Sequence, residues 1–253
     1  MSGHVYVVGL GPGDACHRTP AAGDALGQAR HLVGYGPYLA RIPVRDGQIV
    51  HASDNREELD RARTALRLAA EGETVAIVSS GDAGVFAMAA TLFEAVELQG
   101  GADCEISVVP GVTAMTAAAA RAGAPLGHDF CAISLSDNLK PWETILHRVR
   151  AAAAADFVMA FYNPVSKARP WQLGNVLDLL REVRAPDTLV IFATAVSRPD
   201  EEIVVTTLAE AAPEIADMRT LVIVGSSATR SVPRAGEGAW VYTPRRAGAP
   251  PSR

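Results

Sequence analysis

The chain contains 253 residues, of which 49% are hydrophobic and 20% are charged, and its formal net charge is −5. This balance is typical of a globular protein and argues against nonspecific nucleic-acid binding, which needs a basic surface. The apolar stretches, about ten residues at most, are too short to cross a bilayer, and the N-terminus lacks the pattern of a signal peptide. We therefore expect a cytoplasmic protein that binds neither nucleic acid nor a membrane.

Short β-branched runs alternate with alanine-rich amphipathic segments, a pattern typical of α/β layers around mixed, mainly parallel sheets. Strands are predicted at residues 4–8, 31–33, 75–79, 104–109, 130–135, 157–162, 189–194, 203–206 and 221–224. A last run at 239–242 follows glycine-rich residues and is expected to add an antiparallel edge strand.

Three helix starts carry recognisable capping signals. Thr19 and Pro20 provide a cap and a proline at the first helical position. Asn55 is expected to cap a second helix that ends at Gly72. The buried face of that helix is predicted to contain Leu59, Ala62, Leu66 and Ala69. Thr113 can cap the alanine run that follows it.

Pro110-Gly111 interrupts the chain before this alanine run, and a new series of strands and helices begins near residue 130. The sequence thus predicts two α/β domains, at 1–112 and 113–244, with a Pro/Arg-rich tail at 245–253 that is expected to be disordered. Cys16, Cys104 and Cys131 are far apart, and the histidines are scattered without metal-ligand spacing. Neither a disulfide framework nor a metal site is predicted.

The first glycine-rich loop, Gly9 to Asp14, follows the first predicted strand but lacks the chemistry of a phosphate site. Pro12 has no N–H to donate, and Asp14 places a negative charge near the helix start. The loop also lacks the third glycine of a dinucleotide site, and no acidic residue follows about 20 positions later. Either this is a tight turn with Asp14 as a helix cap, or it faces a ligand that carries no phosphate.

Two further loops also follow predicted strands. The segment from Ser79 to Met88 contains Asp82 and no basic residue, and Ser79 or Asp82 could simply cap the next helix. Pro110-Gly111 fits the centre of a type II turn. Because ligands of α/β sheets bind at the carboxyl ends of strands, these loops together favour a shared site, and Asp82 favours a cationic ligand.

The second half contains Lys140-Pro141-Trp142 and Arg169-Pro170-Trp171, in which a cation, a proline and a tryptophan recur at predicted helix starts. Two prolines at the first helical position with packed tryptophans would explain this pattern. The alternative is a pair of cationic, aromatic loops for a planar ligand with carboxylates. Ser134 to Asp137 precedes the first loop, and Tyr162-Asn163-Pro164 ends another strand.

The succession of segments at 8–14, 80–84, 110–114 and 161–164 resembles the tetrapyrrole methylase family, the class III S-adenosylmethionine-dependent methyltransferases. The resemblance extends to the segments at 34–39, 133–137 and 141–143 and to Ser166, and it covers nearly the whole chain. It implies two α/β domains with a crevice between them and a homodimer. It also implies S-adenosylmethionine as methyl donor, S-adenosylhomocysteine as product and a tetrapyrrole substrate.

The resemblance also suggests roles for individual residues. It implies cofactor contacts from Pro12, Ser80, Gly81, Asp82, Gly84, Val85, Phe86, Thr113, Ala114, Tyr162, Asn163 and Thr194. Expected substrate contacts are Gly11, Gly13, Tyr38, Ser134, Ser136, Lys140, Trp142, Lys167 and Arg169. Candidates for proton transfer are Asp14, Tyr35, Asp137 and His128. A catalytic aspartate of a uroporphyrinogen-methylating relative has no counterpart, since Gly36 stands at that position.

Two other classes of function remain open. A nucleotide-binding module would share the α/β pattern, although the chain lacks the GK[ST] sequence of a P-loop. A methyltransferase of the same family acting on another tetrapyrrole, including a cobalt-bearing one, or on a protein or rRNA, is the second alternative. The acidic net charge and the cationic loops around Lys140 and Lys167 favour a small polycarboxylate over an RNA.

Overall fold

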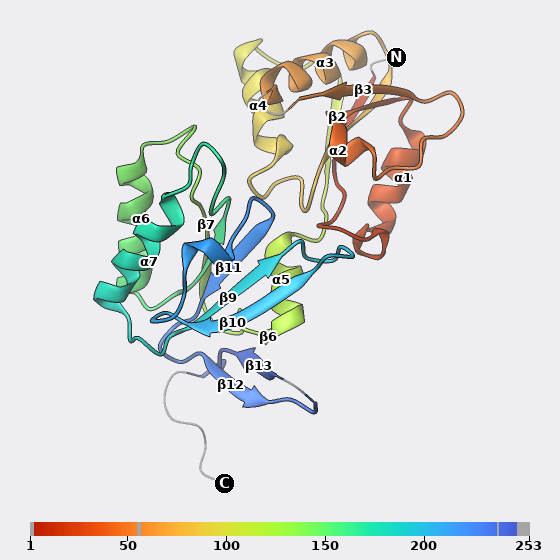
Figure 1. Cartoon of the computed structure of the whole chain (residues 1–253). Helices are drawn as coiled ribbons and strands as arrows, with labels where there is room; N and C mark the ends of the chain where they lie inside the picture. Colours follow the sequence, from red (N-terminus) through yellow and green to blue (C-terminus); the bar gives the residue numbers. More distant parts are fainter. Residues whose placement is uncertain (1–2, 55–56, 237, 247–253) are drawn as a thin grey trace. The chain divides into compact units, whose positions relative to one another are not determined.

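The computed structural model describes residues 3–54, 57–236 and 238–246. By its internal contacts the chain divides into two compact units, Met1–Ala114 and Met115–Arg253 (Figure 1). Asn55 and residues 247–253 of the predicted tail lie outside the described residues. Within the described part, no helix is long and apolar enough to span a membrane.

The first unit contains a five-stranded sheet in the order β3-β2-β4-β1-β5, and every pairing in it is parallel. Its strands are β1 (His4–Gly9), β2 (His31–Tyr35), β3 (Ile49–Ser53), β4 (Thr74–Ser79) and β5 (Glu105–Val109). The three inner strands, β2, β4 and β1, are buried over most of their length, as expected for a parallel sheet covered on both faces.

Helices cover both faces of this sheet. The helices of the first unit are η1 (Ala15–His17), α1 (Pro20–Gln28), α2 (Gly36–Leu39), α3 (Glu58–Ala70) and α4 (Met88–Leu98). Apolar residues of α1 and α2 pack with Val8 and Val78 on one face, and those of α3 and α4 pack with Val7 and Ile77 on the other. α1 follows β1 and α4 follows β4, so the chain continues from these two adjacent strands to opposite faces of the sheet. Such a switch point is where α/β sheets bind ligands.

Two of the capping predictions are confirmed. Thr19 caps α1 by accepting from Ala22 N at 3.1 Å, with Pro20 at the first helical position. Gly72 follows α3 with a φ of +95°, which favours glycine after a helix end. The N-cap of α3 is Glu57, whose carboxylate accepts from Asp54 N at 3.1 Å.

The second unit contains a mixed sheet in the order β10-β9-β11-β8-β7. Its strands are β7 (Phe130–Ser134), β8 (Val158–Tyr162), β9 (Leu189–Thr194), β10 (Glu202–Thr207) and β11 (Thr220–Val224). Only β7 and β8 pair in parallel, and the three remaining pairings of this sheet are antiparallel. The remaining helices are α5 (Ala114–Ala122), α6 (Trp142–Ala154), α7 (Gln172–Val183) and η2 (Pro213–Ile215). Residues of α6 and α7 form the core with Phe161 and Phe192.

A small third sheet has the order β12-β13-β6 and contains β6 (Gly123–Ala124), β12 (Arg230–Pro233) and β13 (Ala239–Tyr242). The predicted last strand thus exists and pairs antiparallel with β12, but it was wrong to expect an edge strand, because β13 is the central strand of this small sheet. Across the described residues, six strand pairings are parallel and four are antiparallel, so the fold is α/β with parallel and mixed sheets, as predicted.

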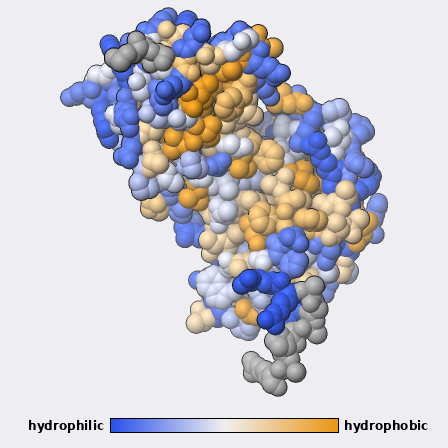
Figure 2. All heavy atoms as spheres, turned by 180° about the vertical axis from the view of Figure 1, so that it is seen from behind, coloured by the Kyte–Doolittle hydropathy of each residue, from blue (hydrophilic) through white to orange (hydrophobic). Residues whose placement is uncertain are grey.

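The surface combines hydrophilic residues with patches of hydrophobic ones, which Figure 2 shows from behind. Exposed large apolar side chains of the first unit include Phe86, Phe93 and Val108, and those of the second include Trp171, Val205 and Trp240.

Candidate functional site

Three loops of the first unit meet at the carboxyl ends of β1, β4 and β5. The loops after β1 and β4 are joined by a pair of backbone hydrogen bonds between Gly11 and Gly81, with N–O distances of 3.0 and 2.9 Å. Leu10 N also donates to Ser79 O at 2.9 Å. These contacts lie at the switch point between β1 and β4, so the structure brings together the loops that the sequence singled out.

Close approach of backbone explains two of the glycines. A Cβ at Gly111 would lie 2.3 Å from Gly81 O, and a Cβ at Gly9 would lie 2.7 Å from the same oxygen. No side chain fits at these distances, so glycine is required at both positions. Gly111 does not have the positive φ that a type II turn needs at its third residue, and that interpretation of Pro110-Gly111 was wrong.

Gly81 is different because its backbone conformation, and not a clash, favours glycine. Its φ of +71° favours glycine, and a Cβ there would meet nothing closer than 3.8 Å, where the backbone of Thr113 and Ala114 lies. Phe86, in the same loop, also has a positive φ of 51° and is half-exposed. Gly81 is buried, whereas Gly84 and Phe86 of the same loop are exposed and can contact a ligand.

The two acidic residues of these loops bind backbone amides. Asp82 accepts from Gly84 N at 2.8 Å and from Gly111 N at 2.9 Å, so its carboxylate occupies amides that a phosphate would otherwise need. Asp14 caps η1 by accepting from Cys16 N at 2.7 Å, and this hydrogen bond lowers the pKa of its carboxyl group. The capping alternative is therefore confirmed for Asp14, while Ser79 accepts from Met88 N at the start of α4.

Arg41 joins the same loops and carries no motif that would have indicated it. Its Nη2 donates to Gly11 O at 2.9 Å and to Gly13 O at 2.7 Å, and its Nη1 donates to Ser80 Oγ at 3.1 Å. These acceptors are carbonyls and a hydroxyl, so no charge pairing in the sequence could have revealed them. Only its position, two residues after α2, could have drawn attention to Arg41.

The remaining expected residues of the first unit lie around these loops. Pro12 is buried, whereas Gly13 and Val85 are partly exposed. Tyr35 ends β2, and its ring contacts that of Tyr38 edge-on, with centroids 5.2 Å apart. Both tyrosines thus lie near the carboxyl end of β2, the same edge of the sheet as the glycine loops.

A second group of expected residues lies in the second unit, at one edge of its sheet. Ser134 ends β7, Tyr162 ends β8, and Thr194 ends β9, and these three strands run in the same direction. Asn163 has a φ of 52° and donates from Nδ2 to Ser134 Oγ at 3.0 Å, which also accepts from Ser136 N at 3.3 Å.

The hydroxyls of Tyr162 and Thr194 have partners within this unit. Tyr162 Oη accepts from Met115 N at 3.1 Å, and Thr194 Oγ1 shares a 2.8 Å hydrogen bond with Thr220 Oγ1. Asn163 and Ser134 thus hold one another, whereas Tyr162 and Thr194 are held by Met115 and Thr220.

The two cation-proline-tryptophan segments meet through their tryptophans. The rings of Trp142 and Trp171 are in edge-to-face contact, with centroids 4.9 Å apart. The prediction of prolines at the first helical position was wrong, because Pro141 is the N-cap of α6 and Pro170 precedes the N-cap of α7. Pro141 is extended, with a ψ of 143°, and α6 begins one residue after it, whereas α7 begins two residues after Pro170.

The basic residues of these segments differ in their surroundings. Burial, and to a lesser degree Arg148, lowers the pKa of the Lys140 ammonium. Arg169 donates to Asn163 O at 3.1 Å, so it also holds the loop that follows β8, whereas Lys167 is exposed. Lys140 and Arg169 therefore provide positive charge beside an aromatic pair, which suits a planar anionic ligand.

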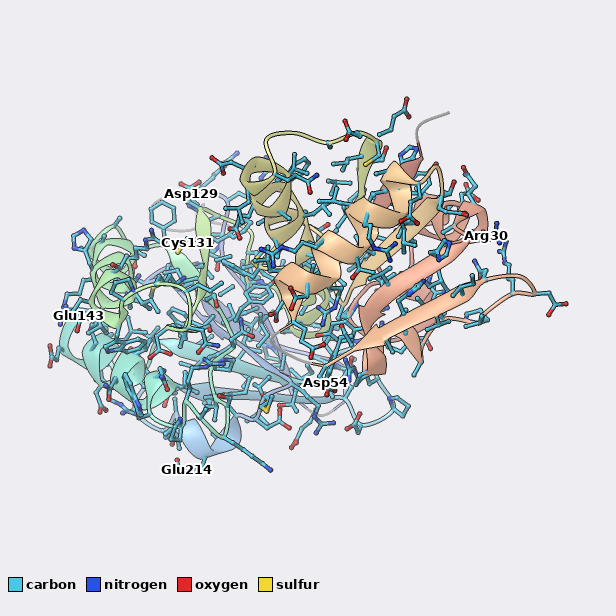
Figure 3. The ribbon with its side chains drawn as sticks, turned by 90° about the horizontal axis from the view of Figure 1, so that it is seen from above. Arg30, Asp54, Asp129, Cys131, Glu143 and Glu214 are labelled. Carbon is cyan, nitrogen blue, oxygen red and sulfur yellow. The ribbon has the colours of Figure 1, made fainter. Side chains whose placement is uncertain are left out.

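Two of the candidates for proton transfer in the second unit are far apart. Asp137 is three residues beyond the carboxyl end of β7, and both of its oxygens accept from Gln172 Nε2, at 3.3 and 3.2 Å. His128 precedes the amino end of the same strand and accepts from Asp129 N at 2.7 Å. Figure 3 labels Asp129, the residue that follows it. A five-residue strand spans about 17 Å, so the structure does not bring His128 to the Ser134–Asp137 segment.

The comparisons with known proteins agree with this arrangement. Residues 4–212 match the family described as Tetrapyrrole (Corrin/Porphyrin) Methylases. The chain belongs to this family. A precorrin-3B C(17)-methyltransferase of Sinorhizobium sp is 58% identical over 97% of both chains, and the crystal structure of the methyltransferase CobJ matches with a TM-score of 0.92 at 58% identity, covering 96% of this chain and 100% of that one.

More distant relatives differ in length or in substrate. The cobalamin biosynthesis protein CobIJ of Mycobacterium tuberculosis is 49% identical, and this chain spans about half of its length, 49%. A probable cobalt-factor III C(17)-methyltransferase of Salmonella typhimurium is 43% identical over 88% of this chain and 92% of its own.

Proposed function

We propose that the protein methylates precorrin-3B at C(17) with S-adenosylmethionine as methyl donor and contracts the ring to give precorrin-4, a step of cobalamin biosynthesis. The observation that carries this proposal is the 58% identity to a precorrin-3B C(17)-methyltransferase over 97% of both chains. A match over the full length includes the loops at the strand ends as well as the core, and function resides in those loops.

The first unit suits a methyl donor that carries a sulfonium and no phosphate. S-Adenosylmethionine supplies a methyl group that is transferred to an electron-rich carbon. The exposed residues Gly84 and Phe86 offer a surface for it, and Asp82 leaves no amide of Gly84 or Gly111 for a phosphate. A relative 25% identical, the uroporphyrin-III C-methyltransferase of Thermus thermophilus, has been solved as a complex with S-adenosylhomocysteine.

Further cofactor contacts are part of the proposal. In the first unit they come from Pro12, Ser80, Val85 and Phe86, and in the second from Tyr162, Asn163 and Thr194. What these residues do for the reaction is to orient the donor, because methyl transfer by in-line displacement depends on alignment more than on acid catalysis.

A tetrapyrrole with carboxylate side chains suits the charges of the second unit. We assign the binding of its carboxylates to Lys140, Lys167 and Arg169, and the stacking of its ring system to Trp142. Ser134 and Ser136 add polar contacts, as do Gly11, Gly13 and Tyr38 of the first unit. The edge-to-face contact between Trp142 and Trp171 supports this assignment, since it places the two cationic segments side by side.

Ring contraction requires proton transfers, and the geometry ranks the candidates. Asp14 caps η1, and this hydrogen bond lowers the pKa of its carboxyl group, which makes the carboxylate a weaker base. His128 lies at the opposite end of β7 from the substrate-binding segment. We therefore assign proton transfer to Asp137, which Gln172 orients, or to Tyr35.

The assembly and the form of the substrate complete the proposal. We infer a cytoplasmic homodimer that takes the metal-free precorrin. The second candidate is the cobalt-bearing substrate named for the Salmonella relative, which is less similar at 43% identity.

To test the function, purified protein is incubated with S-adenosylmethionine and either precorrin-3B oxygenated at C(20) or cobalt-factor III, and product masses are measured. We expect turnover of precorrin-3B, and turnover of cobalt-factor III alone would overturn the assignment.

A further inference from the structure

Arg41 is a partly buried arginine at the switch point of the first sheet that no motif of the sequence includes. It follows α2 and reaches the loops after β1 and β4 with two of its nitrogens. Its own backbone is held in turn, because Arg18 Nη2 donates to Arg41 O at 3.0 Å.

The acceptors of Arg41 belong to two loops that are far apart in the sequence. Gly11 O and Gly13 O lie in the loop after β1, and Ser80 Oγ is at the start of the loop after β4. Three hydrogen bonds of 2.7 to 3.1 Å from one planar guanidinium therefore fix the distance and the angle between these loops. The backbone pair between Gly11 and Gly81 joins the same loops only one residue away from Ser80.

The geometry points to Arg41 as a positioning residue that holds the Gly81 loop in its ligand-binding conformation. This inference rests on the proposed function, because it concerns the same loops. Without the guanidinium, Gly13 O and Ser80 Oγ each lose a charged donor, and the loop from Ser80 to Phe86 is free to move relative to Gly11. A lysine cannot replace the arginine, since one ammonium at the end of a flexible stem does not present two nitrogens in a fixed plane.

The variants are Arg41→Met and Arg41→Lys, with Arg67→Met as the matched control. Arg67 is an exposed arginine that pairs with Glu71 Oε1 at 2.7 Å in the last turn of α3, which leads to the amino end of β4, the end opposite the loops. Calorimetry measures S-adenosylhomocysteine binding to each protein, and circular dichroism confirms the folded state. Initial rates with precorrin-3B give KM for S-adenosylmethionine and kcat separately.

We expect both Arg41 variants to bind S-adenosylhomocysteine at least tenfold more weakly than the native protein and to raise KM for S-adenosylmethionine similarly, with kcat at saturation changed less than threefold. A merely structural role would lower the folded fraction, and therefore kcat, without raising KM. Native affinity in Arg41→Lys, or an equal loss in Arg67→Met, would overturn the inference. Failure of the native protein to bind S-adenosylhomocysteine would instead refute the proposed function and this inference with it.

Discussion

Replacing Gly111 with alanine tests whether the three loops of the first unit pack as closely as the structure indicates. The new Cβ would lie 2.3 Å from Gly81 O and 2.8 Å from both Gly9 C and Gly9 O, whereas ordinary contacts begin near 3.4 Å. A backbone shift of about 1 Å would be needed, and overpacking of this kind costs about 1–3 kcal/mol. At about 2–4 °C per kcal/mol for a chain of this size, Tm should fall by about 2–12 °C.

The matched control is Gly23→Ala, in the interior of α1. A Cβ there meets nothing within 4 Å, and alanine favours the helix by about 1 kcal/mol. Urea unfolding of both variants gives the free energy of unfolding and the slope m. We expect the free energy of unfolding to fall in Gly111→Ala and not to fall in Gly23→Ala. A free energy of unfolding for Gly111→Ala within about 0.5 kcal/mol of the native value, the usual range of a neutral surface change, would refute the close packing of the loops.

The remaining predictions concern the ligands and pH. Gly81→Val should abolish measurable S-adenosylhomocysteine binding, because a branched side chain is strained at a φ of +71° and distorts the loop, and unchanged affinity by calorimetry would reject that role. Lys140→Ala should weaken precorrin-3B binding about tenfold, the equivalent of one charge-assisted hydrogen bond, while S-adenosylhomocysteine affinity stays the same. A parallel loss of both affinities would count against a separate substrate role. Arg169→Ala should weaken the binding of precorrin-3B more than Lys140→Ala does, because it also removes the hydrogen bond from Arg169 to Asn163 O. Burial, together with the charges of His31 and Arg67, lowers the pKa of His51 below 6.5, so folding favours its neutral form. The contribution of neutral His51 to the free energy of unfolding is therefore fully present above pH 6.5 and is lost as pH falls through the lowered pKa. Urea unfolding at about pH 7.5 and pH 5.5 should show a lower free energy of unfolding at the lower pH. In His51→Gln this difference between the two pH values should be smaller.

Much of the fold could be predicted because buried strands are apolar runs bounded by glycine or proline. β1, β4, β8 and β9 were recognised to within about a residue for this reason. β3 was missed because it is an exposed edge strand, in which Ile49 and Val50 are 43% and 41% exposed and no apolar alternation marks it. Antiparallel pairing of β11 depends on contacts between distant segments, and periodicity does not encode them.

The site was predictable where backbone conformation demands a residue type. Gly9, Gly81 and Gly111 are glycines because neighbouring backbone or a positive φ excludes side chains, and such positions stand out in a sequence. Arg41 could not be found because its acceptors are carbonyls and a hydroxyl, which every sequence contains. The expected role of Asp82 changed for a similar reason, since its backbone partners, Gly84 N and Gly111 N, became visible only in the structure.

The most direct test of the central claim is transfer of a labelled methyl group. The purified protein is incubated with precorrin-3B and S-adenosylmethionine carrying a ¹³C-methyl group, and the product is examined by NMR. The account predicts one labelled methyl at C(17) of a ring-contracted product, with one S-adenosylhomocysteine released for each product. A label at another carbon, or no transfer from S-adenosylmethionine to this substrate, would contradict it.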